Sequence, residues 1–201
     1  MIFKQIYFFI VKTFLTVALL ILMSCGDDYV PKPKAYLRLE YPEATYAADN
    51  LELPFSFEIN ELAKEVESKK VKASTESYGI NLEYPSLKGT IFLTYKAIDK
   101  EEKNLRDFLR DAQNFTQKHT VKADEIPVTA YQNIDRKVYG AFAEVKGNVA
   151  SPAQFYVTDS VNHFLTGSLY FYAKPNYDSI LPAANYLKKD IQHIMESITW
   201  K

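Results

Sequence analysis

The sequence predicts one α+β domain in which helices pack on an antiparallel β-sheet. Three observations carry this prediction. Apolar residues alternate with polar ones in several short segments, two longer segments have apolar residues at helical spacing, and strands and helices follow one another in the order strands, helix, strands, helix. Hydrophobic residues make up 47% of the 201 residues, including 15 Tyr and 13 Phe, so the chain can form a core and is not disordered.

The first predicted strands lie between residues 55 and 95. Alternating apolar residues indicate a short strand at residues 55–59 and two longer strands at residues 78–84 and 91–95. The sequence Pro-Ser-Leu-Lys-Gly at residues 85–89 is typical of a turn. The two longer segments therefore predict a β-hairpin.

A helix and three more strands are predicted next. Asn104 is the expected helix N-cap, and the expected buried face comprises Leu105, Phe108, Leu109, Ala112 and Phe115. Strands follow around residues 138–145, 153–158 and 164–173. The last of these has aromatic residues on both faces, which predicts a central strand covered on both sides.

A terminal helix beginning at Asp178 or Ser179 closes the predicted domain. Its expected buried residues are Ala184, Leu187, Ile191, Ile194, Met195 and Ile198. The order of elements resembles the Mog1/PsbP-type sandwich, which is an analogy at the level of the fold only.

The N-terminus has the features of a signal peptide covering residues 1–24. Lys4 and Lys12 precede an apolar stretch at residues 13–23, whose 11 residues fall in the range of about 7–15 for such segments. The alternative is a permanent transmembrane helix at residues 6–23. That helix would place Lys12 inside the apolar span, at a cost of up to about 3 kcal/mol.

The end of the apolar stretch favours the signal peptide. Leu22, Met23, Ser24 and Cys25 resemble the lipobox of bacterial lipoproteins, which implies cleavage between Ser24 and Cys25 and lipidation of the Cys25 thiol. Cys25 is the only cysteine, so an internal disulfide framework is excluded. We therefore expect a removed signal peptide, a lipidated tether at residues 25–35 and a single α+β domain at residues 36–201, held to the bilayer by its acyl chains.

Charge and motifs predict neither nucleic-acid binding nor catalysis. Residues 1–24 contain two lysines and no acid, so the remaining 177 residues carry 22 basic and 25 acidic side chains, a net charge of −3. His119, His163 and His193 lie in three different predicted elements without metal-ligand spacing, so no metal is expected. No cofactor-binding loop or nucleophile motif occurs among the six glycines. We expect no catalytic residue and no cofactor.

Several segments of the chain resemble the gliding motility lipoprotein GldD family. The matching segments are residues 24–28, 31–34, 36–42, 154–160, 163–183 and 198–201, and residues 44–77 match least. The resemblance implies a cell-envelope lipoprotein that is required for surface gliding and for the type IX secretion machinery, and that works beside other envelope proteins. It implies no catalytic residue, and Cys25 alone carries over as a site. The alternative function is a cell-envelope enzyme such as a glycan hydrolase.

The predicted location is the outer membrane. Gly26 follows Cys25, which favours the periplasmic face, whereas Asp27 and Asp28 resemble an acidic signal for export to the cell surface.

The remaining candidate sites lie near the end of the last strand. Tyr172 and Tyr177 are the candidate partner surface, because aromatic side chains offer a large contact area and loops held by a rigid sheet commonly bind. Ser160 and Ser179 each follow Asp and precede an aliphatic residue. This pattern resembles the O-glycosylation sites of the bacteria that carry GldD-family lipoproteins.

Overall fold

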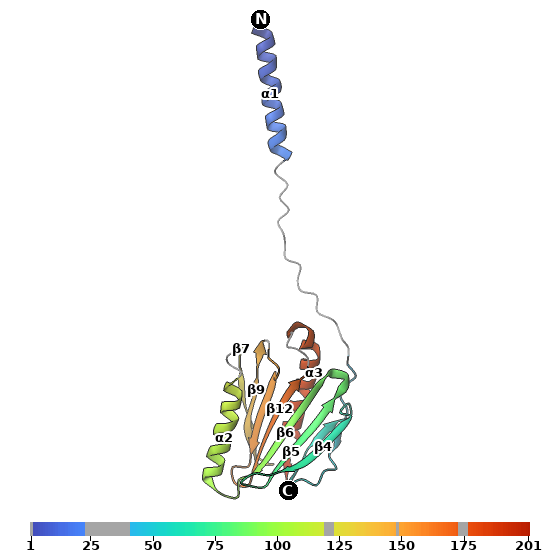
Figure 1. The fold of residues 1–201 in the computed structure, drawn as a ribbon, viewed down its shortest axis with the longest axis vertical. Helices are drawn as coiled ribbons and strands as arrows, with labels where there is room; N and C mark the ends of the chain where they lie inside the picture. The colour runs from blue at the N-terminus through green and yellow to red at the C-terminus, as the bar shows by residue number, and fades with distance from the viewer. Residues whose placement is uncertain (1, 23–40, 119–122, 148, 173–176) are drawn as a thin grey trace. The chain divides into compact units, whose positions relative to one another are not determined.

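The structure is a computed structural model that describes residues 2–22, 41–118, 123–147, 149–172 and 177–201 (Figure 1). The chain divides into two units, Met1–Ala35 and Tyr36–Lys201. The first unit contains one helix, α1 (Ile2–Leu22). None of the described helices combines the length and the apolar character needed to cross a membrane. Ser24, Cys25 and the predicted tether lie outside the described residues.

A seven-stranded antiparallel sheet forms the centre of the second unit, in the order β4-β5-β6-β12-β11-β9-β8. The prediction of an α+β fold is confirmed, and β12 lies at the centre of the sheet as expected. The strands are β4 (Glu65–Val71), β5 (Ser77–Tyr84), β6 (Gly89–Ala97), β8 (Val128–Asn133), β9 (Val138–Glu144), β11 (Ala153–Thr158) and β12 (His163–Phe171).

Three two-stranded sheets flank the large one. They pair β1 (Tyr46–Ala48) with β3 (Glu58–Asn60), β2 (Phe55–Ser56) with β13 (Thr199–Trp200), and β7 (Ala123–Glu125) with β10 (Lys146–Gly147). The single strand predicted at residues 55–59 is therefore wrong. It is divided between β2 and β3, which pair with different partners, while Phe55 and Phe57 are both buried as their alternation suggested.

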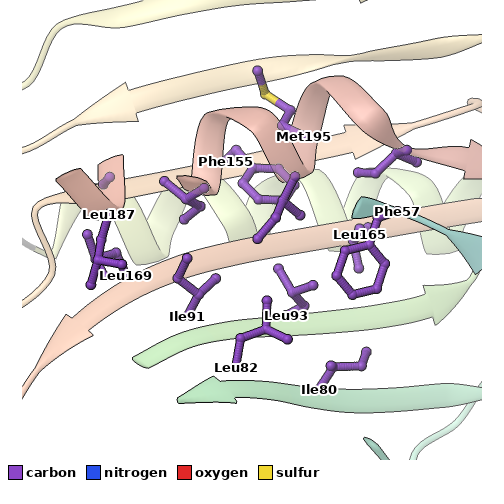
Figure 2. Packing of buried hydrophobic residues seen from close by; sticks show 14 of the residues in the cluster. Phe57, Ile80, Leu82, Ile91, Leu93, Phe155, Leu165, Leu169, Leu187 and Met195 are labelled. Carbon is purple, nitrogen blue, oxygen red and sulfur yellow. The ribbon is translucent and has the colours of Figure 1, made fainter. Parts of the chain in front are cut away.

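Helix α3 (Tyr177–Ser197) packs on one face of the sheet and forms the main core. Leu187 of the helix lies beside Leu169 of β12, next to aliphatic side chains from β5 and β6, as Figure 2 shows. Leu187, Ile191 and Ile194 are fully buried, as predicted. Burying one such side chain contributes about 1.5–3 kcal/mol, so this layer supplies much of the driving force for folding.

Helix α2 (Glu102–Gln117) packs on the opposite face, which we call the second face. The contact is small: its buried residues are Phe108, Phe164 and Ile98, and the rings of Phe108 and Phe164 lie 5.6 Å apart. Phe164 and Leu165 are adjacent in β12, so their side chains point to opposite faces and the central strand is covered on both sides.

Two predictions for α2 are wrong. Its N-cap is Glu101, and Asn104 lies inside the first turn, where its side-chain amide donates a hydrogen bond of 3.1 Å to the carbonyl of Ile98. Phe115, expected to be buried, is 47% exposed. The helical spacing placed it on the correct face, but the sheet below it carries small side chains and leaves the ring uncovered.

The strands β4 and β8 were not predicted. Both are edge strands, and their side chains are mostly exposed, so neither shows the apolar alternation that marks a half-buried strand. β4 has the sequence EVESKKV, whose charges suit an exposed edge.

Gly167 tests the close packing of the main core. A methyl group at this position would overlap the ring of Phe155, which is itself 4% exposed and cannot easily move. We expect Gly167→Ala to lower the free energy of unfolding by about 1–3 kcal/mol, measured by urea denaturation. Gly79→Ala is the matched control, because its methyl group would lie at an ordinary 3.6 Å from Val71 Cγ2. Equal stability of the two variants would contradict this description of the core.

Candidate functional site

The second face carries a hollow of about 580 Å³ between α2 and strands β6, β12, β11 and β9. Ligand pockets commonly have volumes of about 300–1,000 Å³. The hollow exists because α2 covers only part of this face, whereas α3 covers the opposite face closely. Its size and its position on a rigid sheet make it the candidate binding site of the domain.

Side-chain size explains the hollow. Much of its floor consists of small residues: Thr94 from β6, Thr166 and Ser168 from β12, and Ala141 and Ala143 from β9. Thr94 lies directly opposite Thr166 in the sheet. Tyr156 of β11 lies between Thr166 and Ala141 in the sheet, so small side chains surround one ring on the floor beneath α2.

Helix α2 is held at both ends of the hollow. Near its middle, Phe108 rests on Phe164. Near its C-terminus, the Thr116 hydroxyl donates a hydrogen bond of 2.9 Å to Oε1 of Gln154, whose side chain is buried. The Gln154 amide in turn donates to Ser151 Oγ at 3.3 Å. These contacts fix the height of the helix above the floor.

The lining suits binding of apolar and aromatic groups. Phe92, Phe115 and Tyr156 contribute rings, while the hydroxyls of the floor offer a few polar contacts. The charges at the rim neutralise each other, because Lys96 Nζ lies 3.8 Å from Asp111 and 4.6 Å from the centre of the Phe108 ring. Asp111 is the one carboxylate among the described lining residues, so the hollow contains no pair of carboxylates for acid–base chemistry.

Two exposed tyrosines lie beyond the hollow on the second face. Tyr170 and Tyr172 are 42% and 62% exposed, and their rings meet edge-to-face at 6.1 Å. The Thr90 hydroxyl donates a hydrogen bond of 2.9 Å to the Tyr172 hydroxyl, which holds the ring in place. Tyr177 is the first residue of α3 rather than part of a loop, and its side chain lies outside the described residues. That a partner uses Tyr172 and Tyr177 stays a prediction.

The two candidate glycosylation sites lie in different local structures. Ser160 is exposed in the turn between β11 and β12, with a left-handed φ of 68°. Asp159 Oδ1 accepts hydrogen bonds from the backbone N–H groups of residues 161, 162 and 163, which fixes this turn. Ser179 lies in the first turn of α3, and its side chain is outside the described part of the chain.

The predicted separation of the histidines holds for the two that are described. His163 begins β12, where its Nδ1 lies 2.8 Å from the Tyr95 hydroxyl and burial lowers its pKa. His193 lies on α3, with Nε2 2.7 Å from Oε2 of Glu58. Among the described residues, no three His, Cys, Asp or Glu side chains come together as metal ligands. His119 lies outside them.

Asp190 is the polar residue that the sequence reasoning missed. It is 1% exposed, and its carboxylate accepts hydrogen bonds from the Tyr46 hydroxyl at 2.8 Å and the Asn60 side-chain amide at 2.7 Å. Burial raises the pKa of Asp190, and these hydrogen bonds partly offset the rise. A signal existed: Asp190 follows Leu187 by three residues and precedes Ile191, so it lies on the buried stripe of α3.

The surroundings of Asp190 link three elements. Tyr46 belongs to β1, Asn60 to β3 and Asp190 to α3, so the carboxylate joins the start of the domain to its last helix. The His193 ring stacks on Tyr46 at 3.6 Å and extends the contact towards the surface. The buried hydroxyl of Tyr84 lies near this carboxylate, and burial together with Asp190 raises its pKa.

The fold and the hollow define an α+β protein whose open antiparallel sheet carries a ligand-sized site beneath one helix. Residues 26–200 match the sequence model of the family described as gliding motility lipoprotein GldD, so the chain belongs to that family. The resemblance noted in its motifs is thereby confirmed. No curated protein and no solved structure matches the chain, and the analogy to the Mog1/PsbP-type sandwich stays a prediction.

Asp190 predicts a pH dependence of stability. Because its pKa is raised above the ordinary value of 3.8, the folded state binds this proton more tightly than the unfolded chain. Its contribution to the free energy of unfolding is therefore greatest below pH 3.8 and is lost as the pH rises through the folded pKa. We expect the wild type to lose stability relative to Asp190→Asn over this range, measured by urea denaturation at a series of pH values.

Asp190→Ala provides the comparison for the hydrogen bonds. It leaves Tyr46 and Asn60 without their acceptor, so we expect it to be less stable than Asp190→Asn by about 1–3 kcal/mol at every pH, because neither variant carries the titrating group. A difference between the wild type and Asp190→Asn that did not change with pH would contradict the role assigned to this carboxyl group.

Proposed function

We propose that this gliding motility lipoprotein is anchored in the outer membrane through acylated Cys25 and works by binding other envelope proteins of the gliding and type IX secretion machinery. Membership of the family establishes the class of protein. The anchor rests on the lipobox at residues 22–25, and acyl chains such as palmitate would hold it firmly when two or more are present. The folded domain then acts as a structural or accessory component.

The observation that carries this proposal is the accessible hollow beneath α2, together with the tyrosine pair on the same face. The hollow is lined by apolar rings and small hydroxyl groups, and its rim charges Lys96 and Asp111 pair with each other. This lining suits binding of another molecule better than catalysis of bond cleavage. Monomeric proteins seldom expose large apolar surfaces without a use. Phe115 is exposed at the hollow, and Tyr170 and Tyr172 are exposed beyond it on the same face.

The alternative, a glycan hydrolase, would need two accessible carboxylates about 5–10 Å apart. Asp190 is the carboxyl group whose pKa is clearly raised, but it is enclosed by Tyr46, Asn60 and α3 and would not meet a glycan. A systematic Asp, Glu and His to Ala scan separates the two functions. Loss of gliding from one conservative change in a folded, abundant protein would favour the enzyme.

Gly26 after Cys25 supports the periplasmic face of the outer membrane, and Asp27 with Asp28 would support the cell surface instead. Protease treatment of intact cells distinguishes the two, because only a surface domain is degraded.

Of the two candidate O-glycosylation sites, Ser160 is the better supported, since it is exposed in a turn. Loss of glycan mass on Ser160→Ala would identify it.

Lipidation is tested with Cys25→Ser. Without the thiol, we expect the unprocessed precursor to stay in the inner membrane and to take up no labelled fatty acid. The measurements are immunoblotting of separated membranes and metabolic labelling. Normal processing and labelling of the variant would disprove the anchor.

The binding role is tested by filling the hollow. Ser168→Phe places a ring on its floor, so we expect loss of gliding and secretion while the melting temperature changes by only a few degrees. Ser68→Phe adds the same ring to the exposed edge strand β4 and is the matched control. Cells carrying Ser168→Phe that glide normally, with wild-type levels of the protein, would refute the hollow as the binding site.

A further inference from the structure

Strand β8 is an edge strand in the part of the chain that the structure describes. It hydrogen-bonds to β9 on one side, and no described strand lies on its other side. The Glu144 N–H donates to the carbonyl of Pro127 at 3.0 Å, which fixes the register of the ladder. In an antiparallel pair every second residue bonds to the partner strand. Val128, Ala130 and Gln132 therefore direct their N–H and C=O groups towards the open edge.

The two edges of the sheet differ in charge. Edge strands are normally protected from pairing by charged side chains, and β4 at the far edge carries Glu65, Glu67, Lys69 and Lys70 among its seven residues. The sequence of β8 is VTAYQN, with no charge, and most of its side chains are exposed. Its composition is that of a strand able to pair, and nothing in it repels a neutral partner strand.

The hollow adjoins this open edge. Val128 lines the hollow and is 60% exposed, and Phe115 of α2 lines it as well. Side chains at 128, 130 and 132 share the second face, because they pair with Ala143, Ala141 and Tyr139 across β9. A strand added beside β8 would lie about 4.8 Å away and would place alternate side chains on the same face, next to the rim of the hollow.

We propose that β8 binds an extended segment of another protein as an eighth strand of the sheet, with a large apolar side chain of that segment anchored in the hollow. This deepens the proposed binding role and rests on it. Main-chain hydrogen bonds to Val128, Ala130 and Gln132 would supply affinity, and the hollow would select the side chain. Charge complementarity favours a neutral segment, since β8 is uncharged and the rim charges Lys96 and Asp111 pair with each other.

A second copy of this chain is the other occupant to consider. Pairing of β8 with β8 of a second copy would bring only Val128, Ala130 or Gln132 to the second face. The valine and alanine side chains are small and the glutamine is polar, so none would fill a hollow of about 580 Å³ as a Phe, Leu or Met would. The geometry therefore favours an unlike segment with a bulky apolar residue.

The direct test uses a blocked, uncharged heptapeptide, Gln-Phe-Thr-Phe-Thr-Phe-Gln, with its scrambled order Gln-Phe-Phe-Thr-Thr-Phe-Gln as control. The peptide is added to the folded domain, and exchange of backbone amides with water is measured residue by residue by NMR. A peptide at about 1 mM with a Kd of about 0.1 mM should slow exchange at Val128, Ala130 and Gln132 by about tenfold. Thr129 and Tyr131, already bonded to β9, should change little.

Ala130→Pro and Ala130→Lys separate binding from folding. The first removes an outward N–H that the ladder does not use, and the second adds the kind of charge that protects β4. Both should abolish the peptide effect, and Ala130→Lys keeps the test valid if the proline variant does not fold. Leu in place of the central Phe should retain binding, whereas Asp there should remove it.

Three results would overturn the proposal. They are unchanged exchange at all three amides, equal protection by the scrambled peptide, and protection without peptide in a protein that sediments as a dimer, which would assign the edge to a second copy. Gliding of cells carrying Ser168→Phe is measured separately. Loss of gliding there with no peptide effect on β8 would leave the binding role standing and remove the strand-addition mode alone.

Discussion

The contact between Phe108 and Phe164 determines how the second face of the sheet is covered. Phe164 comes from the central strand, so α2 rests on the middle of the sheet and not on its rim. Beyond that contact the floor includes the small residues Thr94, Thr166 and Ser168 beside the ring of Tyr156. One aromatic pair therefore supports α2 near its middle, the Thr116–Gln154 hydrogen bond holds it near its C-terminus, and a hollow remains between them.

On the opposite face of the sheet, by contrast, the helix packs closely on the strands. There α3 brings aliphatic residues into close contact with β6 and β12, and the one polar group on its buried stripe, Asp190, is satisfied by residues from β1 and β3. These two strands come early in the domain, so the carboxylate fixes the segment that follows residues 25–40 to the last helix. A buried polar network whose groups are hydrogen-bonded can specify which elements pack together, although it adds little net stability.

The strands and helices that pack against a core were predictable from the sequence, whereas the edge strands of the sheet were not. The alternation in β5, β6 and β12 and the helical stripe of α3 reflect contact with a core, so they appear in the sequence. β4 and β8 have solvent on most of their side chains and leave no such pattern, and β8 is identified only by its hydrogen bonds to β9. The sequence did not identify Asp190 as a buried carboxyl group, because its hydrogen-bond partners Tyr46 and Asn60 lie more than 120 residues away in the chain.

The hollow itself is a result of tertiary structure that no local pattern predicts. Phe115 has the correct spacing for burial, and it would be buried if the sheet beneath it carried larger apolar residues. Filling that space would add about 25 cal/mol for every Å² of apolar surface removed from water. The chain instead combines small hydroxyl side chains on the floor, an exposed ring on the helix and an uncharged edge strand at the rim. The exposed ring and the unfilled space forgo burial in the isolated domain, and the uncharged edge is open to pairing. All three features become favourable once a neutral, extended segment lies along β8 with an apolar side chain in the hollow.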